Sequence, residues 1–238
     1  MAPRGGVFVS HVTVTVTSAA AEVRFTLDGS VPTTNSPRYA APLQISNSCV
    51  LHVRAFGQPG SSAAETYTLL ETNLLDFNSN LPLVLIQTFG HTIQPDTNVM
   101  VSVRFIDTGT NNRASIRGAG NFDGRAGVKT RGYSSRRYPK RSLSLETRTP
   151  EGESQHVPLL GFPKDSDWVL YAPYPDKTML RDVLAYELSN QIGRWAPRTK
   201  FVELFLNETG GKVSRRDYLG VYVFEEKVKR DKNRVNIA

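Results

Sequence analysis

An alternation of valine and threonine near the start of the chain most limits what it can fold into. Residues 12–17 read Val-Thr-Val-Thr-Val-Thr, and residues 23–27 again place an apolar side chain at every second position. A period of two is typical of half-buried strands, because successive side chains point to opposite faces of a sheet. Asp28-Gly29 follows, a pair that tolerates positive φ and therefore predicts a turn.

The alternation continues through the first third of the chain. Further strands are expected at residues 49–56 and 65–69, and a cluster of turn residues separates them. No helical pattern interrupts these short strands, which favours a sandwich of two sheets. We therefore predict an all-β, immunoglobulin-like sandwich over residues 5–72.

A polar stretch without periodicity, residues 73–80, is the expected linker, and the pattern changes after it. The total length of 238 residues allows two domains, so residues 81–238 are assigned to a second one. Its expected elements are one helix over residues 177–192 and several strands, at residues 83–86, 99–106, 142–147, 167–173, 201–207 and 218–226. This order predicts an α+β unit in which one long helix covers one face of an antiparallel sheet.

The predicted helix carries a carboxylate in an unexpected place. Leu180, Leu184 and Leu188 form an apolar face at helical spacing, and Glu187 falls inside that arc. A buried carboxylate is costly unless a cation pairs with it. In the alternative reading the helix end turns outward and Glu187 reaches water.

Lys140 is the cation nominated as the partner of Glu187. It precedes the strand at residues 142–147, so its side chain is expected to project from the sheet that the helix covers. Arg137 and Arg141 remain competitors, because alternation alone does not exclude them. A strand lysine paired with a helix glutamate is how protein kinases hold the α- and β-phosphates of ATP.

The first segment resembles the chitobiase/β-hexosaminidase C-terminal domain, a fibronectin type III-like module. The resemblance rests on VRFTLDGSVPTTNSPRYAAPLQIS, the strand VLHVRAF and the closing ETYTL. It implies an accessory domain without catalytic residues, which would contact a cell-surface glycan or protein. Asp28 is accordingly read as a turn former.

The second segment resembles the CotH kinase family. The matching motifs are GRAGVKTRGYSSRRYPKRSLSLE, PLLGFPKDSDWVLYAPYPDKTMLRDVLAYELSNQIG, APRTKFVELFLN and YLGVYVFEEKVKRDKNRVNI. The resemblance implies the N-lobe of a kinase-like fold and ATP-dependent phosphoryl transfer to Ser or Thr of a protein substrate, with Mg or Mn. It further implies a secreted or cell-surface protein of bacterial type.

The same resemblance supplies the expected site residues. Arg131, Ser134 and Ser135 match a Gly-rich segment expected near the phosphates, where small hydroxyls and backbone N–H groups can reach phosphate oxygens. A turn that only joins two strands is the alternative. Lys140 and Glu187 also match family positions. The catalytic and metal-binding acids are expected beyond residue 238, so this fragment alone is expected to be inactive.

Composition excludes several other chemistries. Cys49 is the only cysteine, and the four histidines lack the spacing of metal ligands. The Gly-rich stretch is not a Walker loop, and no apolar run is long enough to span a bilayer. The net charge of +7 favours anionic partners, but aromatic residues are too few among the basic ones to predict nucleic-acid binding. A non-catalytic protein that binds or adheres to surface glycans or proteins remains the alternative function.

Overall fold

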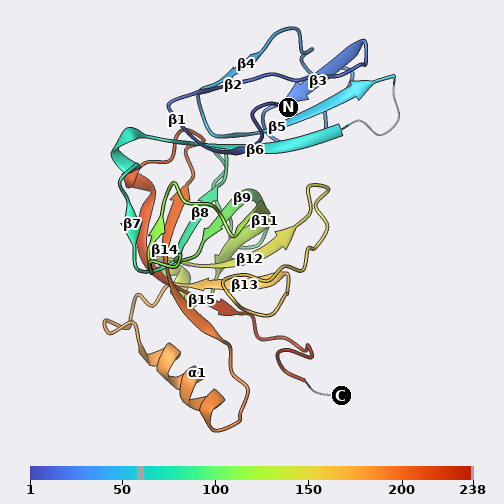
Figure 1. Cartoon of the computed structure of the whole chain (residues 1–238). Coiled ribbons are helices and arrows are strands. Elements are labelled where there is room, and N and C mark those ends of the chain that lie inside the picture. Colours follow the sequence, from blue (N-terminus) through green and yellow to red (C-terminus); the bar gives the residue numbers. More distant parts are fainter. Residues whose placement is uncertain (58–61, 237–238) are drawn as a thin grey trace. The chain divides into compact units, whose positions relative to one another are not determined.

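The chain divides into two compact units, seen here in a computed structural model that describes residues 1–57 and 62–236. Each unit has its own buried apolar core, and each is described by itself. Figure 1 labels helix α1 and most of the strands. Unit 1 comprises Met1–Phe77, Gln87–His91 and Asn207–Asp217, and unit 2 comprises Asn78–Ile86, Thr92–Leu206 and Tyr218–Ala238.

Unit 1 is built from two sheets around one core. A four-stranded sheet has the order β1 (Gly6–Val9), β6 (Ser62–Leu70), β5 (Cys49–Phe56) and β3 (Glu22–Thr26), and a two-stranded sheet pairs β2 (Val12–Val14) with β4 (Leu43–Ile45). Val14, Leu51 and Tyr67 are fully buried between them. The predicted N-terminal β domain is therefore confirmed.

The Val-Thr run forms a shorter strand than the alternation predicts. Strand β2 ends at Val14, because the backbone N–H of Val16 donates to the hydroxyl oxygen of Tyr39 (3.0 Å) and leaves the ladder. Short helical turns complete unit 1 at Thr72–Leu74 and Arg215–Asp217. The two turns are connected by a backbone hydrogen bond close to both of them. The Glu71 N–H, just before the first turn, donates to the carbonyl oxygen of Val213, just before the second (2.8 Å).

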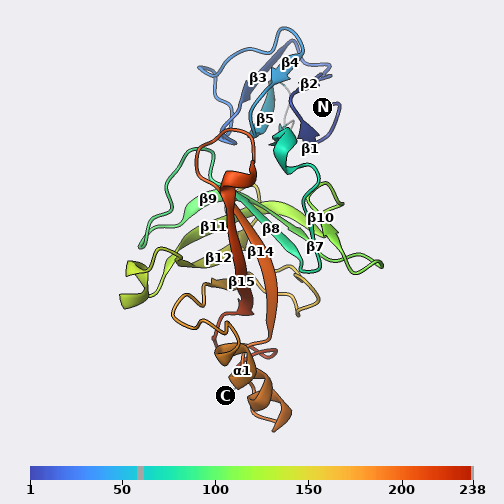
Figure 2. The same ribbon diagram turned by 90° about the vertical axis from the view of Figure 1, so that its left-hand side faces the viewer.

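A closed seven-stranded barrel forms the body of unit 2. Its strands follow the order β11 (Phe122–Arg131), β12 (Ser142–Arg148), β13 (Asp167–Tyr171), β15 (Tyr218–Glu226), β14 (Thr199–Asn207), β8 (Leu83–Gln87) and β9 (Val99–Ile106), and β9 pairs back to β11. Figure 2 shows the antiparallel pair β14 and β15 side by side. The short strands β7 (Asn78–Ser79) and β10 (Ala114–Ser115) form a separate pair.

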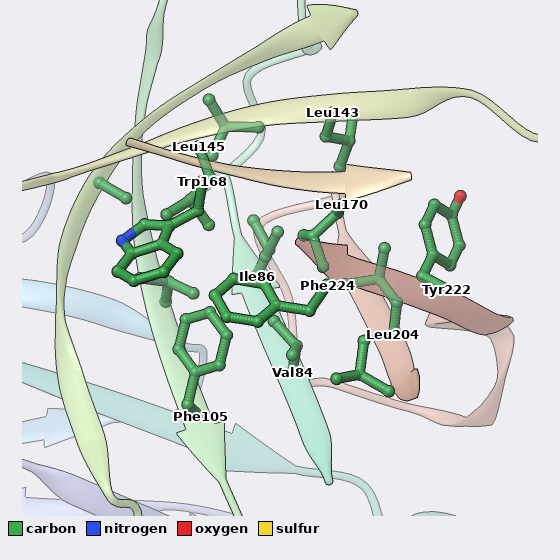
Figure 3. Close-up of a cluster of buried hydrophobic side chains, with 14 of the residues drawn as sticks. Val84, Ile86, Phe105, Leu143, Leu145, Trp168, Leu170, Leu204, Tyr222 and Phe224 are labelled. Carbon is green, nitrogen blue, oxygen red and sulfur yellow. The ribbon is translucent and has the colours of Figure 1, made fainter. Parts of the chain in front are cut away.

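The inward side chains of the barrel make a dense aromatic core (Figure 3). Phe224 of β15 lies at its centre, with ring centroids 5.1 Å from Trp168 and 5.2 Å from Phe105. Because side chains alternate along each strand, Leu143 and Leu145 of β12 enter the same interior. A closed barrel buries this face without help from a helix and leaves no free sheet edge.

The Gly-rich stretch contains the longest strand of the barrel, which its composition did not predict. Glycine usually weakens a strand, but here Gly124 and Gly127 make room for neighbouring side chains. A Cβ atom at Gly124 would lie 2.7 Å from the ring of Phe122, and one at Gly127 would lie 3.1 Å from the Asn98 side chain. The glycines therefore serve packing within β11.

The helix differs from its prediction in length and burial. Helix α1 (Arg181–Gln191) begins where Asp176 accepts a hydrogen bond from the Arg181 N–H (3.0 Å), and it is followed by Gly193 at φ +77°. None of its residues is buried, and Leu184 is 57% exposed. In Figures 1 and 2 the helix extends beyond the end of the barrel. A kinase-like N-lobe with a sheet covered by one long helix is thus not confirmed.

Candidate functional site

The loop between β11 and β12 concentrates the predicted site residues. It spans residues 131–141, is here called the basic turn, and contains five cationic side chains and no acidic one. Its ends are fixed because Arg131 and Ser142 are opposite each other in the antiparallel ladder. The barrel therefore presents this charged segment at a defined place on its rim.

Gly132 determines the path of the basic turn. Its φ of +101° is a conformation that favours glycine, and a Cβ atom there would lie 1.9 Å from Oγ of Ser135. Ser134–Arg137 then form a single 3-10 turn, in which the Tyr138 N–H donates to the Ser135 carbonyl oxygen (3.2 Å). The predicted residues Arg131, Ser134 and Ser135 are thus brought together in one tight turn.

Two of the five cations of the basic turn lack a partner within the part of the chain that the structure describes. Arg137 and Arg141 are exposed, and their guanidinium groups form no ion pair or hydrogen bond there. Arg136 meets only the exposed carboxylate of Asp96, at 3.6 Å. This surface is suited to an anion that would supply the missing counter-charge.

Lys140 is held by β15. Its Nζ donates to the carbonyl oxygen of Val221 (2.5 Å) and lies 4.5 Å from the centroid of the Tyr222 ring. Burial lowers the pKa of Lys140, and the nearby Glu203 carboxylate opposes this shift. The carboxylate that acts on Lys140 thus comes from β14 and not from the helix.

Glu187 lies elsewhere. It is exposed on α1, and its Oε1 accepts a hydrogen bond from Nε2 of Gln191 one turn later (2.9 Å). The structure does not bring Lys140 and Glu187 together. The outward reading of the helix end, which the sequence left open, is the arrangement observed for this carboxylate.

A second ionisable group, Glu225, interacts electrostatically with Arg131 of the predicted site. It is 8% exposed on the outer side of β15, opposite the buried Val169 of β13. No hydrogen bond reaches its carboxylate among residues 1–57 and 62–236. Burial raises the pKa of Glu225 to about 7, while Arg131 lowers it and Asp182 of α1 raises it further.

Tyr171 and Asp182 complete the surroundings of Glu225. Burial and the Asp182 carboxylate raise the pKa of the Tyr171 phenol. The Asp182 carboxylate at the start of α1 thus repels the carboxylate of Glu225, whereas Arg131 attracts it. The sequence contains a signal for this group, because Glu225 shares one strand face with Val221 and Val223.

Metal-binding and membrane-spanning features are absent from the described ranges. No three His, Cys, Asp or Glu side chains are grouped there so that they could hold a metal ion. In those same ranges, no helix has the length and apolar character required to cross a membrane.

Comparison with known proteins finds two family models that each match one part of the chain. Residues 3–68 match the family model described as the chitobiase/beta-hexosaminidase C-terminal domain. Residues 128–238 match the model described as CotH kinase protein, and this range includes the basic turn, α1 and Glu225. No curated protein matches the chain. Residues 128–238 are therefore similar to the CotH kinase family, and residues 3–68 are similar to the chitobiase/β-hexosaminidase C-terminal domain.

Proposed function

We propose that this chain is the N-terminal, nucleotide-binding part of an ATP-dependent protein kinase that transfers the γ-phosphate to Ser or Thr of a protein substrate. The family match to residues 128–238 supports the class of reaction. The closed turn at Gly132, which sets Ser134 and Ser135 beside Arg131, is the observation that carries the proposal. On the family likeness alone, we also propose a secreted or cell-surface location in a bacterium.

The residues of the basic turn fit the phosphates of ATP. A triphosphate needs cationic and hydrogen-bonding groups that approach it without obstruction, and the turn offers Arg131, two serine hydroxyls and a glycine. Lys140 is included as a further cation, because this residue is only partly buried. Glu187 stays a prediction, since pairing it with Lys140 requires α1 to take another position.

The divalent metal of such a kinase is proposed without ligands in the described residues. Phosphoryl transfer by kinases uses acidic residues that hold Mg²⁺ against the phosphates. The described parts of unit 1 and unit 2 contain no cluster suited to that role. We therefore assign phosphate contacts to the basic turn and no metal contacts to any residue.

Photoaffinity labelling tests the nucleotide site directly. The 238-residue chain is irradiated with an ATP derivative that carries an aryl azide on its γ-phosphate, and the labelled peptide is identified by mass spectrometry. We expect label in or next to residues 131–141 that excess ATP suppresses. Arg131→Ala and Lys140→Met should each reduce the label at least fivefold, whereas Arg117→Ala, an exposed arginine on a different loop of unit 2, should change it less than twofold. Labelling that excess ATP leaves unchanged would disprove the site.

A further inference from the structure

Two segments that are distant in sequence form one aromatic surface beside the basic turn. Tyr138 of the turn stacks on Tyr174, which lies between β13 and α1, with ring centroids 5.3 Å apart and planes inclined by 30°. Lys177 places Nζ 4.8 Å from the centroid of the Tyr174 ring. With the neighbouring Arg137 and Arg141, these residues are called the Tyr–Arg surface.

The aromatic pair remains open to a partner. Tyr138 is 39% exposed and Tyr174 is 38% exposed, although each ring covers part of the other. Tyr133, at the tip of the same turn, is 90% exposed. Large aromatic side chains are usually buried in a folded domain, so a group of exposed tyrosines marks a contact surface.

The charges around this pair are also unsatisfied. Arg137 and Arg141 have no ion pair within the described ranges, and the turn itself contributes no carboxylate. Lys177 interacts with Tyr174 through its ring and its carbonyl oxygen, not with an acid. A partner at this surface must therefore carry negative charge to gain from electrostatic steering.

The choice of residue types favours a polypeptide partner. Tyr and Arg are enriched at the centres of protein–protein interfaces and dominate their binding energy, whereas Lys is depleted there. The basic turn has four arginines and two tyrosines but one lysine, and that lysine is turned toward β15. An ordinary solvated charged face, or a site for phosphate alone, has no need of a stacked tyrosine pair.

We infer that the Tyr–Arg surface docks an acidic segment of a protein partner. The arginines pair with its carboxylates, and the exposed tyrosine edges pack against its side-chain stems. Docking needs no nucleotide. It therefore goes beyond the proposed function, and either can fail while the other stands.

Binding of a defined acidic peptide tests the inference. A fluorescein-labelled twelve-residue peptide of alternating Glu and Ser is titrated with the full chain, without nucleotide, and its anisotropy is recorded. A peptide with Lys in place of Glu should not bind. The double variant Arg137→Glu/Arg141→Glu should weaken binding of the Glu peptide at least tenfold. Arg117→Glu, carrying one of the same charge changes on another exposed loop, should weaken it less than twofold.

The tyrosine pair is tested separately from charge. Tyr138→Ala should weaken peptide binding at least threefold, while Tyr138→Phe, which keeps the ring, should retain it. Circular dichroism confirms that each variant is folded. The inference is overturned if the double charge variant binds like Arg117→Glu. It is also overturned if single-stranded poly-dT or a heparin oligosaccharide of equal charge displaces the peptide more strongly than unlabelled peptide does.

Discussion

The ammonium group of Lys140 donates to the carbonyl oxygen of Val221 and thereby ties the basic turn to β15. The tie matters for the site because the same turn holds Arg131 and the two serines. The Tyr222 ring makes a cation–π contact with the same ammonium group, with its centroid 4.5 Å from Nζ. Lys140 therefore helps to position the turn, apart from any contact that it makes with a nucleotide.

Replacing Lys140 by methionine should loosen this tie. The change removes one hydrogen bond and one cation–π contact, which together stabilise by about 1–2 kcal/mol. Urea unfolding should show that loss, and Lys140→Arg should recover part of it. Lys232→Met, at an exposed lysine near the end of the described chain, should stay within about 0.5 kcal/mol of the parent. Equal stability of the Lys140→Met and Lys232→Met variants would contradict the positioning role.

The strands could be predicted from sequence because their side-chain period is local. Strands β5, β9 and β15 have the bounds that alternation predicts, residues 49–56, 99–106 and 218–226. Closure of the barrel could not be predicted in this way. It depends on pairing between β9 and β11. The glycines of β11, which leave space for the side chains of Phe122 and Asn98, interrupt the apolar alternation by which a strand is recognised.

The part of the site that is local in sequence could also be predicted. Arg131, Ser134 and Ser135 are near one another in sequence, so their meeting in one turn follows from a short loop. The partners of Lys140 and Glu187 depend on how α1 faces the barrel, which a helical wheel does not determine. An apolar stripe predicts burial only if something covers it, and Leu184 is exposed here.

Glu225 should make stability depend on pH. Its pKa in the folded chain is about 7, above its ordinary value of 4.5, so the folded state penalises the charged carboxylate. The penalty is absent below pH 4.5, grows between pH 4.5 and about 7, and is constant above that. It should reach about 3 kcal/mol, because a pKa raised from 4.5 to about 7 disfavours the charged form by that amount.

Glu225→Gln should remove that penalty. Urea unfolding at pH 5 and pH 8 should show a variant that gains stability relative to the parent as the pH rises. The groups that face this carboxyl, Arg131 and Asp182, remain unchanged in the comparison. For Glu187→Gln, the same change at an exposed position of α1, the difference in unfolding free energy from the parent should be the same at both pH values. If the stability difference between Glu225→Gln and the parent is also the same at both pH values, Glu225 is not held in an unfavourable charged state.

Gly132→Ala should disrupt the basic turn by crowding as well as by backbone strain. Gly132 and Gly152 both have positive φ, +101° and +96°, but only Gly132 has a neighbour, the Ser135 hydroxyl, where a Cβ atom would lie. Strain alone costs on the order of 1–2 kcal/mol. We expect Gly132→Ala to lose more stability than Gly152→Ala, and Ser135→Ala to restore part of the difference in the double variant. Equal losses of stability in Gly132→Ala and Gly152→Ala would show that crowding against Ser135 contributes nothing.

A buried ion network fastens the segment after β15 to the barrel. Arg234 is 3% exposed, lies over the Trp168 ring at 5.3 Å, and donates to the carbonyl oxygens of Lys227 (2.7 Å) and Asp167 (2.8 Å). Its Nε is 3.4 Å from the carboxylate of Asp165. Burial acts to raise the pKa of Asp165, but its hydrogen bond to Lys229 and the charge of Arg234 lower the pKa overall.

Removing Arg234 should therefore be costly. Arg234→Ala removes two hydrogen bonds to backbone carbonyl oxygens and a cation near Asp165 and Glu226, although Lys229 and Arg198 still pair with these two carboxylates. We expect a loss of about 2–4 kcal/mol. Because the pKa of Asp165 is lowered, the network contributes stability above pH 3.8 and loses it as the pH falls further. The deficit of Arg234→Ala, measured by urea unfolding, should accordingly be larger at pH 7 than at pH 3. Arg230→Ala, at an exposed arginine of the same segment, should cost less than about 0.5 kcal/mol. A deficit at Arg234 as small as that at Arg230 would mean that the segment is held by its backbone contacts alone.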